Sequence, residues 1–198
     1  MALNSKRKDY SLLIISSSEQ FNIAIKKILP GGTFSAIETR KSASAAKREL
    51  LERHYDVIII NAPLPDEFGV DFVMDIQDRH NSGILVAVPG EVFDTVTDRT
   101  IDYGVIVVPK PVKLAMVERG VRLLIAVQNR LRSNEKKIKS LEDKITEIRF
   151  VARAKLMLIQ NGMNEEEAER YIIKQAMDGG VRKSVVAEEI IENGGIKS

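Results

Sequence analysis

The feature that most restricts the fold of this chain is a seven-residue repeat of apolar side chains in its second half. One series is Leu124, Leu131, Ile138, Ile145 and Ala152, and a second series, three residues further on, is Val127, Asn134, Leu141, Ile148 and Lys155. No Gly or Pro falls between residues 124 and 155. These are the a and d positions of a heptad repeat, so we expect one long helix from about residue 113 to residue 161.

At about 1.5 Å per residue this helix would be roughly 70 Å long, which is more than one small domain can cover. A second copy of the chain is therefore expected to cover the apolar seam. Asn134 within the seam is expected to lower stability while it fixes the register and the number of helices. The alternative is a helical hairpin within one chain.

The first half of the chain has a different periodicity. Apolar runs at 12–15, 57–60, 84–88 and 105–108, and a weaker run at 33–37, alternate with helical patterns at about 19–29, 41–53, 69–80 and 92–102. Short runs rich in β-branched residues are typical of strands buried on both faces of a parallel sheet. We expect an α/β fold, a doubly wound five-stranded parallel sheet with its site at the carboxyl ends of the strands.

The composition argues against several kinds of site. The 198 residues include no Cys and only two His, His54 and His80, so thiolate chemistry and a multi-histidine metal site are not expected. No stretch approaches about 18 consecutive apolar residues, and the N-terminus lacks the cleavage site of a secretory signal. We find no catalytic constellation and expect no cofactor. The expectation is a cytoplasmic protein that is not an enzyme and binds neither metal nor membrane.

Two shorter helices are expected after the long one. Asn161 and Gly162 suit the end of the long helix, and Asn164 suits the start of the next helix, which has three Glu residues in its first turn. Residues 178–180, Asp-Gly-Gly, interrupt that helix, and Ser184 is the expected cap of the last one. The C-terminal third is therefore predicted to be a three-helix, all-α domain.

The N-terminal half resembles the receiver domain of response regulators in two-component systems. Residues 56–69 read DVIIINAPLPDEFG, in which Pro65 and Gly69 match positions that follow the family's phosphoacceptor strand. Lys110-Pro111 matches the family's Lys-Pro pair after the fifth strand. The resemblance, over about residues 9–125, implies the flavodoxin-like receiver fold.

The residues that this resemblance assigns to phosphorylation are replaced. Asn61 stands at the phosphoacceptor position, Ser16 and Ser17 stand where the family has the acidic pair that helps to hold Mg²⁺, and Val88 replaces the switch hydroxyl. Hydroxyls and an amide do not supply the carboxylate charge that Mg²⁺ requires. These residues indicate a pseudo-receiver. We expect the Asn61 amide to form a hydrogen bond in the vacated pocket, with Lys110 as a candidate partner, and a small anionic ligand there is the alternative.

The C-terminal residues resemble the ANTAR domain, the RNA-binding module of transcription antiterminators. The matching segments, over about residues 140–193, are 154–158, 161–163, 165–168, 175–178 and 186–191. The resemblance implies binding to paired hairpins in nascent mRNA by a dimer held together through the preceding coiled coil. Gly179, Gly180 and Val181 stand where the family carries a basic residue, which predicts a different affinity or choice of target.

The distribution of charge agrees with a polyanionic partner. Residues 1–116 hold 14 basic and 15 acidic residues, whereas residues 119–155 hold eleven basic and four acidic ones. Positive charge on the long helix suits contacts with RNA phosphates, although it is also typical of a solvated coiled-coil surface. The candidate RNA-binding residues are Arg149, Arg153, Lys155, Lys174, Arg182 and Lys183.

These observations predict three parts: a pseudo-receiver over residues 1–116, a coiled-coil dimerisation stalk over 117–147 and an ANTAR RNA-binding domain over 148–198. The predicted function is transcription antitermination by a homodimer that binds structured mRNA leader hairpins. Protein concentration, a protein partner on the receiver face or another ligand would replace phosphorylation as the control. The alternatives are a DNA-binding response regulator, a dimeric scaffold that presents the pseudo-receiver to a protein partner, and a receiver that still accepts phosphate.

Overall fold

The computed structural model describes residues 10–68 and 70–195, so Gly69 of the motif above lies outside the described residues. The chain divides into two compact units, one ending at Leu131 and the other beginning at Arg132. The division falls inside the long helix α5 (Leu114–Gln160), whose bounds agree with the helix predicted from the heptad repeat. In the part of the chain that the structure describes, no helix is both long and apolar enough to cross a membrane.

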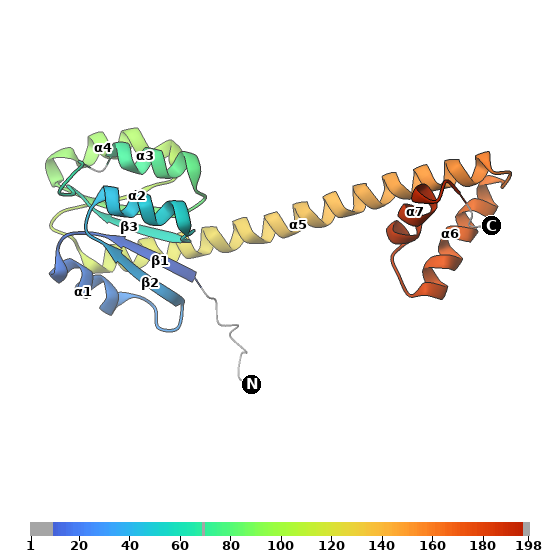
Figure 1. Ribbon diagram of the computed structural model, residues 1–198. Coiled ribbons are helices and arrows are strands. Elements are labelled where there is room, and N and C mark those ends of the chain that lie inside the picture. Colours follow the sequence, from blue (N-terminus) through green and yellow to red (C-terminus); the bar gives the residue numbers. More distant parts are fainter. Residues whose placement is uncertain (1–9, 69, 196–198) are drawn as a thin grey trace. The chain divides into compact units, whose positions relative to one another are not determined.

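The N-terminal unit contains a parallel sheet of five strands in the order β2-β1-β3-β4-β5 (Figure 1). The strands are β1 (Tyr10–Ile15), β2 (Phe34–Arg40), β3 (Val57–Asn61), β4 (Gly83–Val88) and β5 (Ile106–Pro109). The helices between them are α1 (Glu19–Ile28), α2 (Ala43–Glu52), α3 (Val70–Arg79) and α4 (Phe93–Thr100), with short 3-10 turns η1 (Gly90–Val92) and η2 (Ile101–Tyr103). The predicted doubly wound sheet is confirmed. The run at 33–37 is weak in the sequence because β2 is a half-exposed edge strand.

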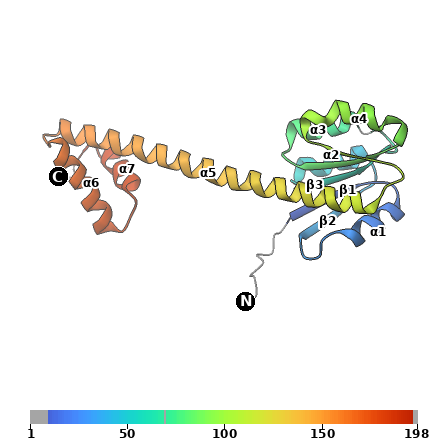
Figure 2. The same ribbon diagram turned by 180° about the vertical axis from the view of Figure 1, so that it is seen from behind.

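Side chains that alternate along each central strand form two apolar layers. Leu13 and Ile15 of β1 pack under α2, α3 and α4, whereas Leu12 and Ile14 pack under α1 and the first part of α5. Figure 2 shows α1 and this part of α5 on the face of the sheet opposite α3 and α4. Burial on both faces explains why the strand sequences are continuous apolar runs.

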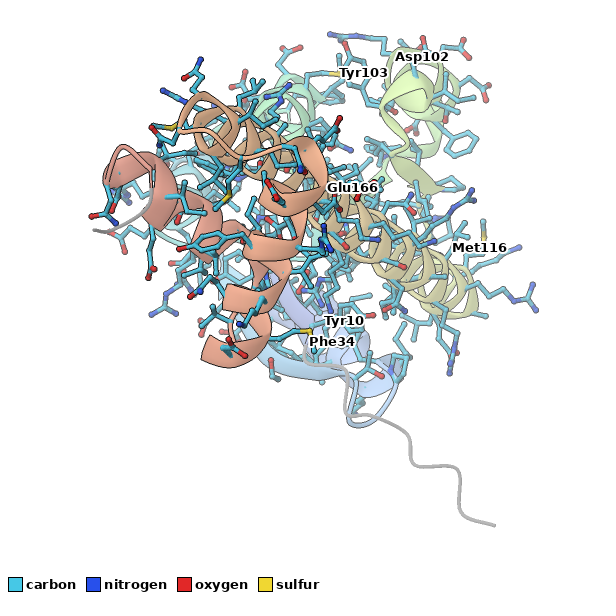
Figure 3. All side chains as sticks on the ribbon, turned by 90° about the vertical axis from the view of Figure 1, so that its right-hand side faces the viewer. Tyr10, Phe34, Asp102, Tyr103, Met116 and Glu166 are labelled. Carbon is cyan, nitrogen blue, oxygen red and sulfur yellow. The ribbon has the colours of Figure 1, made fainter. Side chains whose placement is uncertain are left out.

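The first turns of α5 belong to the N-terminal unit. Val117, Val121 and Leu124 are buried against the sheet, and a Cβ added at Gly120 would lie 2.7 Å from Leu85 Cδ1, so glycine permits the helix to approach closely. The expectation that Leu124 begins an intermolecular seam is therefore wrong, because the sheet already covers it. Tyr10 adds a second tie at this end of the sheet: its hydroxyl donates to Asn129 Oδ1, and its ring meets Phe34 edge to face (Figure 3).

The C-terminal unit consists of the rest of α5, α6 (Glu165–Gly179) and α7 (Lys183–Glu192). Asn164 caps α6 as predicted, because its side chain accepts from Glu167 N while the Glu167 carboxylate accepts from Asn164 N, each at 2.9 Å. The predicted Ser184 cap is wrong by two residues. The backbone N–H groups of Val185 and Val186 donate to the Arg182 carbonyl, so Arg182 is the N-cap of α7.

Candidate functional site

The first candidate site is the pocket at the carboxyl edge of the sheet, where β1 and β3 end side by side. Asn61 is the last residue of β3, and its Nδ2 donates to Ser16 Oγ at 2.9 Å. Ser16 is completely buried, and its hydroxyl also accepts from the backbone N–H of Ser18 at 3.1 Å. The two residues therefore form a neutral amide–hydroxyl pair. Ser16, rather than Lys110, is the hydrogen-bond partner of the Asn61 side chain.

Lys110 enters the same region from the end of β5. Its Nζ donates to the carbonyl oxygen of Ala62, the residue after Asn61, and burial lowers the pKa of its ammonium group. The other two predicted pocket residues lie elsewhere. Ser17 is exposed, and the Val88 side chain is fully buried in the apolar layer beneath α2, α3 and α4. Asn61, Ser16 and Lys110 are thus brought together, and Ser17 and Val88 are not.

The pocket residues do not fit Mg²⁺. Ser16, Asn61 and Lys110 offer a hydroxyl, an amide and an ammonium group, whereas a hard divalent cation needs carboxylate oxygens. Asp66, in the loop after β3, accepts from the Ser44 hydroxyl and from the backbone N–H groups of Ser44 and Ala43 at the start of α2, which lowers its pKa to about 2. Across residues 10–68 and 70–195 no three His, Cys, Asp or Glu side chains lie together as a candidate metal site.

The second candidate site is the surface of the C-terminal unit, which is built on one apolar core. Ala154 and Leu158 of α5, Ala168 and Ile172 of α6, and Ala187 of α7 are buried in it. Arg149 and Arg153 are exposed, and they are one turn apart on the α5 face that points away from this core. Helix α5 thus presents two neighbouring guanidinium groups to solvent on the side opposite the core.

The other four predicted RNA-binding residues do not share that face. Lys155 faces α6, where its Nζ lies 2.8 Å from Glu169 and 3.3 Å from Glu165, and only 18% of its side chain is exposed. Hydrogen bonding to Glu169 raises the pKa of Lys155 and lowers that of Glu169. Lys174 is exposed on α6, and Arg182 and Lys183 are exposed at the start of α7.

An apolar stripe follows the exposed side of α5 through the second unit. It consists of heptad residues whose exposed fractions range from 51% to 68%, namely Ile138, Leu141, Ile145 and Ile148. Leu131, the last residue of the first unit, begins the same series and is 41% exposed. We call these five residues the outer stripe. They lie at the predicted a and d positions, and nothing in the described chain covers them.

One residue of this surface, Lys144, is not among the residues predicted from the sequence. A groove of about 410 Å³ on the C-terminal unit is lined by Lys144, Ile148, Ala152, Lys155, Glu169 and Lys183, and we call it the Lys144 groove. Lys144 directly precedes the a position Ile145, so it occupies a g position. Heptad position could have singled it out, because g side chains flank the seam. The groove also brings together Lys155 and Lys183, which are 28 residues apart in the sequence.

Comparison with known proteins places these two units. Residues 139–191 match the ANTAR domain family. Over 147 residues the chain is 27% identical to the transcriptional regulatory protein PdtaR of Mycobacterium tuberculosis, a match that covers 73% of this chain and 71% of that protein.

Solved structures are similar to the N-terminal unit. A signal receiver domain of an HD domain-containing protein from Pseudomonas fluorescens aligns with a TM-score of 0.55 at 18% identity, over 67% of this chain and 97% of that chain. A chemotaxis response regulator of Vibrio cholerae aligns with a TM-score of 0.51 at 16% identity, over 59% of this chain and 99% of that chain. These likenesses show that the sheet and its helices have the receiver fold.

Proposed function

We propose that this chain, in which a receiver fold is followed by a match to the ANTAR domain, is an antitermination regulator that binds hairpins in nascent mRNA. The match over residues 139–191 carries this proposal. Arg149 and Arg153 support it, since exposed guanidinium groups suit both phosphate contacts and stacking on unpaired bases. We propose that it acts in the cytoplasm, as part of the same function.

Direct binding tests the proposal. The full chain should bind an RNA with two tandem hairpins more tightly than a scrambled RNA of the same length or duplex DNA, at physiological salt. The affinity should fall as salt rises, because bound phosphates release counterions. Equal affinity for all three nucleic acids would contradict specific hairpin recognition, and tighter binding to duplex DNA would favour a DNA-binding regulator.

We also propose that two copies of the chain associate through the outer stripe. Exposed apolar residues at a and d spacing match what a coiled coil buries. Sedimentation equilibrium should give the mass of two chains, and Ile145→Glu should give that of one. Lys136→Glu, which changes an exposed residue at an f position, should leave the dimer intact.

The receiver fold is proposed to work without phosphorylation. The Asn61 amide is a poor nucleophile, and its Nδ2 is engaged with Ser16. Incubation with labelled acetyl phosphate and Mg²⁺ should therefore leave the protein unlabelled, and labelled protein would revive the alternative of a working receiver. Control would pass to protein concentration, a ligand or a protein partner.

A scaffold that only presents the receiver fold is the second candidate, and one observation favours it. Leu51 of α2 is 78% exposed beside a groove of about 200 Å³ between α2 and α3, so an apolar surface is available to a protein. Charge reversal at Arg153 and Lys174 separates the two functions. An antiterminator should lose its activity in this variant, whereas a scaffold should keep it.

A further inference from the structure

Charge is distributed unequally along the two edges of the outer stripe. The g positions carry Arg130, Lys137 and Lys144, and the e positions carry Glu135, Glu142 and Arg149. All six side chains are exposed. One edge is therefore entirely basic, and the other is acidic until its last position.

This pattern favours one orientation of a second copy. In a parallel, in-register coiled coil each g residue faces the e residue five positions further on in the other helix. Arg130 then faces Glu135, and Lys137 faces Glu142, so two oppositely charged pairs form on each side. An antiparallel pair would instead place basic g residues against basic g residues. The charges at these positions therefore select the parallel arrangement.

The third pair breaks the pattern next to the Lys144 groove. In the parallel arrangement Lys144 faces Arg149 of the second copy, and both groups are positive. The lining of the groove includes Ile148 and Ala152, which are d and a positions, so the second helix would lie along its edge. Because Lys144 also lines the groove, the like charges meet beside it.

The groove itself is suited to an anion. Three lysines and two glutamates line it; Lys155 and Glu169 pair with each other, and the remaining charges are Lys144 and Lys183 against Glu147. Lys183 is the first residue of α7, and the N-cap Arg182 makes no side-chain hydrogen bond to the helix. Backbone N–H groups in the first turn of a helix carry partial positive charge and favour phosphate.

We propose that the Lys144 groove and Arg149 of the second copy together form one phosphate-binding site for the RNA backbone, so that each bound hairpin contacts both chains. The site rests on the RNA-binding function and the dimer proposed above. Lys144 and Arg149 of the second copy repel each other when the site is empty. A bound phosphate removes this repulsion, so RNA binding and dimer formation strengthen each other.

The geometry can be tested without RNA, because the chain contains no cysteine. Leu131→Cys and Ile145→Cys, made as separate variants and oxidised mildly, should each form a disulfide-linked dimer on a non-reducing gel. Lys136→Cys, at an exposed f position, is the control and should not. Disulfide formation at only one of the two a positions would indicate an antiparallel dimer and overturn the proposal.

The shared site is tested by charge reversal with two measurements of opposite sign. Arg149→Glu replaces the repulsion with an attraction between Lys144 and the introduced carboxylate, so the dimer dissociation constant should fall severalfold. The same variant should bind tandem-hairpin RNA at least tenfold more weakly. Lys144→Glu should act in the same two directions. The double variant again places like charges opposite each other, so its dimer dissociation constant should return to near the wild-type value, while its RNA binding stays weak. Lys136→Glu, which changes the charge equally, should alter both constants less than twofold.

Each other outcome contradicts a definite step. Effects on the dimer that simply add in the double variant would show that residues 144 and 149 do not meet across the interface, since positions five apart do not face each other within one helix. Wild-type RNA affinity in Arg149→Glu would refute the shared phosphate site while leaving the antiterminator proposal intact. Failure of the wild-type chain to bind hairpin RNA would refute both.

Discussion

Both units of this protein have an apolar core, but they differ in where their polar side chains lie. In the receiver fold the central strands are fully buried, and the polar groups at their carboxyl ends bond to one another: Asn61 to Ser16, and Lys110 to the Ala62 carbonyl. In the C-terminal unit the core is equally apolar, yet Arg149 and Arg153 extend to solvent. In both units, therefore, the residues that pack the core are different from those that form the polar contacts or reach solvent.

In the pocket at the carboxyl ends of β1 and β3, Asn61 and Ser16 form a neutral pair beside the Lys110 ammonium group. Buried donors and acceptors without partners cost about 1–3 kcal/mol each. The hydrogen bond from Asn61 Nδ2 to Ser16 Oγ gives both side chains a partner. The hydrogen bond between Asn61 and Ser16 thus joins the carboxyl ends of β3 and β1.

The largest expected effects come from opening a cavity in each core. Leu158→Ala should destabilise the C-terminal unit by about 2–5 kcal/mol and abolish RNA binding, because the residue is completely buried between helices that position the exposed cations. Ile59→Ala should destabilise the N-terminal unit by a similar amount, yet leave the RNA affinity within about twofold of the wild-type value. Thermal unfolding and RNA titration of both variants check this. Loss of RNA binding in both variants would contradict the assignment of RNA binding to the C-terminal unit alone.

A smaller effect is expected from one exposed arginine in each unit. Arg153→Ala should weaken RNA binding roughly threefold to tenfold and reduce the slope of log affinity against log salt by about 0.7–1, as expected for one lost phosphate contact. Arg99→Ala, which removes a cation paired with Asp71 in the N-terminal unit, is the matched control. An unchanged slope in Arg153→Ala would remove this residue from the RNA interface.

Acid should affect the receiver fold through Asp66. Hydrogen bonds from Ser44 and Ala43 lower the pKa of Asp66 to about 2, so its stabilising contribution is complete above its ordinary pKa of about 3.9 and is lost as the pH falls towards 2. Asp66→Asn should therefore lower the melting temperature at pH 7, and the difference from wild type should disappear near pH 2. Asp98→Asn, an exposed residue of α4, serves as the control. A constant difference at all pH values would exclude this cause.

The smallest effect is expected from restoring the phosphoacceptor alone. Asn61→Asp should remain unlabelled by acetyl phosphate, because Ser16 and Ser17 still provide no carboxylate for Mg²⁺. Mass spectrometry of the intact protein checks this, with a phosphorylatable receiver domain as positive control. A phosphorylated variant would show that the single replacement at residue 61 silences the pocket.

Periodicity predicted most of the fold, and it failed where two kinds of packing share one helix. The strand runs and the heptad repeat gave nearly correct bounds for β3, β4 and α5. The repeat also included Leu124, although the sheet buries that residue. An apolar residue at a heptad position suits a domain core and a coiled coil equally well, so spacing alone does not distinguish them.

The sequence by itself determined the order of the elements, the ANTAR match and the absence of a carboxylate at residues 16, 17 and 61, because each depends on residue type and spacing along the chain. Only the tertiary structure decided which polar groups meet. It paired Asn61 with Ser16, placed Lys155 between Glu165 and Glu169, and brought Lys183 beside the helix that carries Lys144. Such contacts join residues far apart in the chain, and their partners are fixed by the packing of helices and strands rather than by local pattern.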